Sequence, residues 1–152
     1  MTFSEVLDLM DVEHNWAFLP KTVVIDGVPR LQTFCNDYAS VVCAAKGARL
    51  PPTSANDQWN YLHSKQAMAD GWSQCSEAEA RASAADGLLV VAVMEGKKDG
   101  HIGVVLESSP ESPDVTDVSS AGGRNHRRCT LDQSFGLPPE GPIHMFVHPG
   151  RD

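Results

Sequence analysis

Two side chains in this sequence have the types and local settings of a nucleophile and its base. Cys35 follows an apolar approach and opens a helical pattern, so its sulfur should lie at a helix N-terminus. The unpaired N–H groups and the positive dipole end of a first helical turn favour the thiolate, which is the reactive form of cysteine. His101 follows a turn-forming segment and opens an apolar strand. A cysteine and a histidine in these positions indicate nucleophilic catalysis.

Acyl transfer by cysteine also needs an acceptor that holds the imidazole, and donors for the oxyanion that develops on the substrate. If the strand that His101 opens pairs with the strand after the next proline-containing turn, Asp117 lies opposite the histidine. Ser119 shares the face of Asp117, and Asp114 is a less well-placed alternative. The Cys35 backbone N–H would be one oxyanion donor, and the preceding loop would supply another. The predicted catalytic residues are therefore Cys35, His101 and Asp117.

The helix that carries the nucleophile is expected at residues 35–46. Apolar side chains recur at three-to-four spacing from Cys35, and Gly47 suits the position just after a helix end. The Pro51-Pro52 pair prevents continuation. This regular support would hold the sulfur in a fixed position.

Other segments predict helices first and antiparallel strands afterwards. Ser54 and Ser76 begin capping patterns, which predict a second helix running toward Met68 and a third ending at Ala85. Apolar or alternating runs predict strands at residues 23–25, 88–94, 101–106, 115–120 and 143–147. Parallel pairing would need crossover helices that the second half lacks. The pattern favours an α+β fold, with N-terminal helices packed on an antiparallel sheet.

Composition limits the classes of function. The 152 residues predict a single domain, residues 1–152, and a formal charge of −8 argues against nucleic-acid binding. The local exception, residues 124–128, is interpreted as a solvated loop. No apolar run approaches the length of a membrane span, so we expect no membrane insertion, and the first eight residues lack the features of a Sec signal peptide.

The cysteine spacing does not resemble that of a structural zinc site, and no cofactor is expected. Cys43 is expected to be a buried apolar residue, and a Cys75–Cys129 disulfide is left open. A metal enzyme is an alternative prediction, because His144 and His148 would point to one face of a strand.

Five segments resemble those of NlpC-type cell-wall cysteine peptidases, over about residues 30–122. The matching segments are Phe34–Tyr38, Gly47–Pro51, Ala55–Gln58, Gly87–Ala92 and Gly100–Val105. In that family the cysteine heads a helix that a Gly-x-x-Leu-Pro turn follows, and a His-x-Gly motif in paired strands carries the base. In the small size of the chain, the resemblance is closest to small peptidoglycan amidase effectors delivered by type VI secretion.

The resemblance implies a papain-like core and a hydrolase that cuts the peptidoglycan peptide stem, typically between D-glutamate and diaminopimelate. It also implies an antibacterial toxin that degrades the cell wall. Such an effector is made in the cytoplasm without a Sec signal, acts in the periplasm of a target bacterium and has a cognate immunity protein. Two alternatives remain open: a phage-type endolysin with the same chemistry, and a noncatalytic acidic binding domain.

Overall fold

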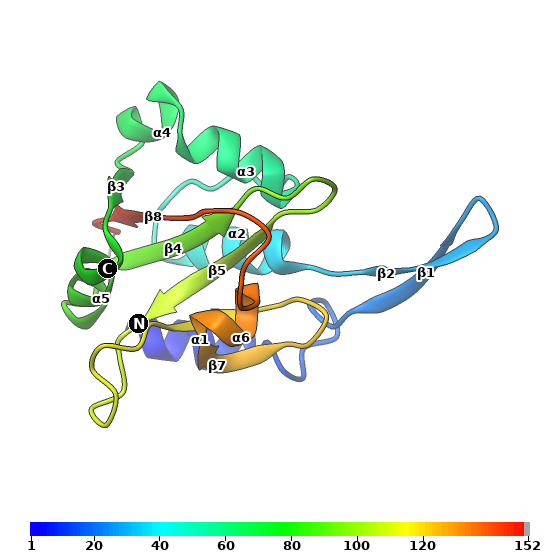
Figure 1. The fold of residues 1–152 in the computed structure, drawn as a ribbon. Coiled ribbons are helices and arrows are strands. Elements are labelled where there is room, and N and C mark those ends of the chain that lie inside the picture. The colour runs from blue at the N-terminus through cyan, green and yellow to red at the C-terminus, as the bar shows by residue number, and fades with distance from the viewer. Residues whose placement is uncertain (151–152) are drawn as a thin grey trace.

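The computed structural model describes residues 1–150 and is a mixed α+β fold (Figure 1). Within these residues the helices are α1 (Phe3–Met10), α2 (Cys35–Ala45), α3 (Ala55–Leu62), α4 (Lys65–Ala69), α5 (Glu77–Ala85) and α6 (Leu131–Phe135). The strands are β1 (Lys21–Ile25), β2 (Val28–Gln32), β3 (Ser73–Cys75), β4 (Leu89–Met94), β5 (His101–Leu106), β6 (Asp117–Ser120), β7 (His126–Thr130) and β8 (Ile143–His148). The predicted α+β class and antiparallel sheet are confirmed.

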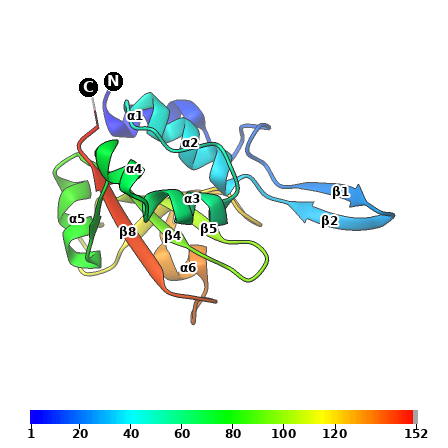
Figure 2. The same cartoon turned by 90° about the horizontal axis from the view of Figure 1, so that it is seen from above.

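The main sheet has the strand order β3-β8-β4-β5-β6-β7, and every pairing in it is antiparallel. Helices cover both of its faces (Figure 2). All six residues of β4 are buried, because Leu89, Val91 and Val93 pack with α1–α4 while the alternate side chains pack with α5 and α6. Side chains of a strand alternate between faces, so a strand covered on both sides is apolar throughout. This explains the uninterrupted apolar run in β4.

Helix α2 begins at Cys35 and ends at Ala45, in agreement with the predicted helix. Tyr38, Val42 and Cys43 on its inner face are completely buried, which fixes the helix against the sheet. The expectation for Cys43 is thereby confirmed. Gly47 has a φ of 73°, the left-handed conformation that a glycine after a helix adopts without steric cost.

Strands β1 and β2 form a separate hairpin that extends away from the body of the protein (Figures 1 and 2). Its turn residues, Asp26 and Gly27, both have positive φ, as a two-residue hairpin turn requires. At its base the Lys21 ammonium lies 3.7 Å from the centre of the Trp16 ring and 4.6 Å from that of Phe34. This cation–π contact ties the hairpin to the residue before Cys35.

Two local predictions are wrong, and one open question is answered. The second helix does not run on toward Met68: it ends at Leu62, and a new helix begins after the Ser64 cap. Residues 124–128 are not a solvated loop, because they lead into β7 and their two last arginines form ion pairs with Asp8 and Asp117. All four cysteines are free, so the Cys75–Cys129 disulfide is not formed.

Candidate active site

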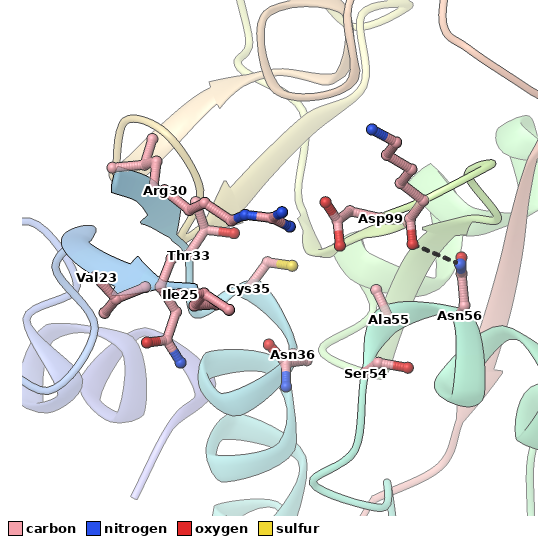
Figure 3. Close-up of a pocket in the computed structure, with 14 residues that line it drawn as sticks. Val23, Ile25, Arg30, Thr33, Cys35, Asn36, Ser54, Ala55, Asn56 and Asp99 are labelled. Carbon is pink, nitrogen blue, oxygen red and sulfur yellow. Dashed lines mark hydrogen bonds between the residues drawn. The ribbon is translucent and has the colours of Figure 1, made fainter. Parts of the chain in front are cut away.

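Cys35 lies at the floor of an open cleft with a cavity volume of about 440 Å³ (Figure 3). It is the first residue of α2, and only 5% of it is exposed. The β1–β2 hairpin, the start of α2, the start of α3 and the β4–β5 loop form the cleft, and each contributes side chains to it. Representative residues are Arg30 from β2, Cys35 from α2, Ala55 from α3 and Asp99 from the β4–β5 loop. The thiol therefore has a site beside it in which a substrate can bind.

Burial raises the pKa of the Cys35 thiol above its ordinary value. The nearby backbone N–H groups of Ile102, Asn36 and Cys35 itself favour the thiolate and oppose this rise in pKa, whereas nearby Asp37 adds to it. Because burial dominates, the resting side chain is a neutral thiol. The sulfur lies on the face of β5 that carries Ile102. Side chains alternate along a strand, and the His101 ring lies on the opposite face, where it packs with Ser134 and Phe135 of α6.

His101 is the first residue of β5, where its strand leaves the loop that closes the cleft. Its Nε2 is hydrogen-bonded to the Ser134 hydroxyl at 2.8 Å, and its ring packs edge-on against Phe135 with 4.6 Å between ring centroids. Burial lowers the pKa of His101 to about 4. The imidazole is therefore neutral at pH 7 and able to accept a proton. His101 is not itself among the residues that line the cleft, but its neighbour Gly100 is.

The structure does not place Asp117 beside His101, so the predicted third position needs correction. Asp117 pairs with Leu106, at the opposite end of β5, and its carboxylate accepts a 2.7 Å hydrogen bond from Arg128. The turn between β5 and β6 is centred later in the chain than expected. When the centre of the turn shifts by one residue, the residue opposite His101 shifts by two. Continuing the register brings Gly122 opposite His101, and a Cβ there would lie 3.4 Å from the ring carbon Cε1.

Ser134 occupies the position that was expected for Asp117. Its hydroxyl bridges His101 Nε2 and the Ser120 hydroxyl, each at 2.8 Å. Ser134 belongs to α6, a helix that the sequence reasoning missed. A signal for this helix exists, since Thr130 and Gln133 form a complete capping box.

Helix α3 joins the cysteine helix to the loop before His101. The Asn56 side chain accepts a hydrogen bond from the Gly96 N–H at 3.0 Å and donates to the Gly96 carbonyl at 3.1 Å. Buried Gln58 donates from Nε2 to the Asn36 carbonyl, the Ser40 hydroxyl and the Pro51 carbonyl. The Asn56 and Gln58 side chains hold α2 and the β4–β5 loop in fixed positions relative to α3. The polar residues of α3 therefore have a positioning role.

The two histidines of β8 have separate partners. His144 Nδ1 lies 2.7 Å from His63 Nε2, whereas buried His148 donates to the Asp70 carbonyl and accepts from the Gly150 N–H. Across residues 1–150, no three side chains of the ligating types are grouped as a metal site would require. No observation therefore favours the alternative metal site.

Ser134→Ala should lower kcat between about threefold and tenfold, because one neutral hydrogen bond that orients the His101 ring is lost. Asp117→Asn is the matched comparison: it should destabilise the fold through the Arg128 pair and leave kcat unchanged. Steady-state kinetics and thermal unfolding of both variants check this. A kcat loss in Asp117→Asn alone would restore the original assignment.

Acid should destabilise the protein through His101. Its pKa is about 4 when folded and near 6.5 when unfolded, so the unfolded chain binds the proton more tightly. Above pH 6.5 the neutral ring makes its full contribution to the free energy of unfolding. This contribution falls as the pH drops, and about 3 kcal/mol of it is lost at pH 4. Urea unfolding of the wild type and His101→Gln at pH 7 and pH 4 measures it. Equal losses in both proteins would contradict the assignment.

The protein is thus an α+β protein with a cysteine at a helix start, packed against the first residues of a histidine-bearing antiparallel strand. No model of a known protein family matches the chain, and no curated protein matches it at a significant level. Among residues 1–150, no helix has both the length and the apolar character to cross a bilayer.

Proposed function

We propose that this protein is a cysteine-dependent peptidoglycan amidase with a papain-like, NlpC-type core. It hydrolyses an amide bond in the peptide stem, between D-glutamate and diaminopimelate. The observation that carries the proposal is the Cys35 thiol at the N-terminus of α2, on the floor of a cleft and against the strand that His101 opens.

In this mechanism the resting pair is neutral. The sulfur attacks the amide carbon while the imidazole takes the thiol proton. Ser134 holds the His101 ring through Nε2 on the α6 side of β5, so this step requires the ring to turn toward the cleft, and the ring nitrogen that carries no hydrogen then accepts the proton. The oxyanion is stabilised by the Cys35 backbone N–H, which has no partner within the first turn of a helix.

Collapse of the tetrahedral intermediate expels the amine, which leaves with the proton from the imidazolium. The acyl group remains on the sulfur as a thioester. Water then attacks the thioester, His101 takes a proton from that water, and the carboxylic acid is released with the thiol restored. Every proton is carried by His101, so the mechanism requires no metal ion.

In the same proposal the protein is an antibacterial effector. It is made in the cytoplasm, is delivered by type VI secretion to the periplasm of a target bacterium and is neutralised in its producer by a cognate immunity protein. The resemblance of the nucleophile and base segments to those effectors supports this role.

The test is digestion of diaminopimelate-type peptidoglycan, followed by mass spectrometry of the products. Cleavage should create a free amino group on diaminopimelate and a free γ-carboxyl on glutamate, and iodoacetamide should stop it by alkylating Cys35. Products cut at the glycan–peptide junction would refute the proposed bond. If protein with an unmodified Cys35 leaves the peptidoglycan intact, the proposed function is refuted.

A further inference from the structure

Two opposite charges face one another across the cleft above Cys35. Arg30 extends its guanidinium group from β2, and the Asp99 carboxylate points toward it from the β4–β5 loop (Figure 3). Within residues 1–150 neither group forms an ion pair, with the other or with any other side chain. Both charges therefore remain available to a bound molecule.

The position of Arg30 follows from the register of the hairpin. Arg30 pairs with Val23, and Ile25 shares their face of the hairpin because side chains alternate along β1. Val23, Ile25 and Arg30 all line the cleft, so this face is its outer wall. The wall combines apolar contact surface with one cation, whereas the chain as a whole carries a charge of −8. A positive group held at such a position favours a negatively charged group of the substrate.

Asp99 lies on a segment that α3 holds in place. Asn56 bonds to both backbone groups of Gly96 and donates to the Lys98 carbonyl, one residue before Asp99. A Cβ at Gly100 would come within 2.5 Å of the Asn56 side chain, so the chain after Asp99 is tightly packed as well. The carboxylate is thus presented to the cleft from a fixed backbone. An ammonium group is the natural complement of an unpaired carboxylate in this position.

We propose that Arg30 and Asp99 form a two-charge subsite that binds a substrate segment carrying a carboxylate and an ammonium group together. Arg30 binds the carboxylate through its forked donors, and Asp99 accepts hydrogen bonds from the ammonium group. The free amino-acid end of a diamino diacid side chain has this chemistry. The assignment rests on the proposed function, because it identifies which residue of the peptide stem the cleft selects.

The experiment compares three stem peptides that differ in the side chain of the third residue. The first has diaminopimelate, with both charges. The second has lysine, which lacks the carboxylate, and the third has acetyl-lysine, which lacks both. Wild-type kcat/KM should fall about tenfold at each step, since each removes one charge-assisted contact. Arg30→Gln should abolish the preference for diaminopimelate over lysine, and Asp99→Asn the preference for lysine over acetyl-lysine.

Two variants control for net charge. Lys65→Gln and Asp86→Asn change exposed charges outside the cleft and should keep both preferences of the wild type. The subsite is refuted if Arg30→Gln leaves the ratio of kcat/KM for the diaminopimelate and lysine peptides at its wild-type value.

Binding to Cys35→Ala, measured by calorimetry, separates this proposal from the catalytic one. If the wild type cleaves none of the peptides, the proposed function fails, but the subsite still requires that Cys35→Ala bind the diaminopimelate peptide about tenfold more tightly than the lysine peptide. The added substitution Arg30→Gln should remove that difference. Equal binding of the two peptides to Cys35→Ala would overturn the subsite in either case.

Discussion

Replacing Cys35 with alanine should lower kcat on peptidoglycan stem peptides by about 10⁴-fold or more. The thiol supplies the only atom that forms a covalent bond to the substrate in the proposed mechanism, and no neighbouring group replaces it. The substitution removes a single buried sulfur at a helix start, so the fold should be retained. Product release from defined muropeptides, followed by liquid chromatography, measures the loss.

Cys75→Ala is the matched control. Cys75 is a half-buried free thiol on β3, away from the residues that line the cleft, so its variant should keep wild-type activity. Far-UV circular dichroism of both variants verifies that each is folded. Substantial activity in folded Cys35→Ala would rule out catalysis by this residue, as would inactivation by alkylation of Cys75 alone.

His101→Gln should lower kcat between about 10²-fold and 10⁴-fold, the range associated with loss of a general acid–base group. Glutamine can still hydrogen-bond to Ser134 but cannot take the thiol proton or protonate the leaving amine. Because the His101 pKa is about 4, wild-type activity should lose its base only as the pH falls through that value. Single-turnover rates across pH measure both effects.

His144→Gln serves as the control for the loss of an imidazole. His144 is hydrogen-bonded to His63 and stacked on Trp59, with 4.6 Å between ring centroids, and it does not line the cleft. Its variant should retain wild-type kcat. If His101→Gln and His144→Gln behaved alike, His101 would not be the base.

Local signals in the sequence were sufficient for the elements that carry the two reactive groups. Apolar spacing and Gly47 define α2 within one residue of its observed end, and the Ser76 capping box opens α5 as predicted. The start of β5 at His101 was also predicted, because a glycine-bounded turn precedes an apolar run. In each case the information lies within a few residues of the element itself.

The missed parts of the site depend on contacts between distant segments. The partner of His101 is set by the centre of the β5–β6 connection, and a small shift there exchanged Asp117 for residues near Gly122. Edge strand β7 contains Arg127 and Arg128, whose charges are balanced only by tertiary ion pairs. The hairpin was visible as Val23–Ile25, yet nothing local to it indicates that one of its faces borders Cys35.

In the proposed function, the hairpin of β1 and β2 separates the choice of substrate from the chemistry performed on it. The sulfur and the imidazole belong to elements buried in the core, whereas Arg30 stands on a protruding ribbon joined to the body at its base. Loops and ribbons of this kind accept changes of sequence that a packed core does not. Under the proposed function, exchange of this one short arm would change the substrate while the packed elements that carry Cys35 and His101 stay unchanged.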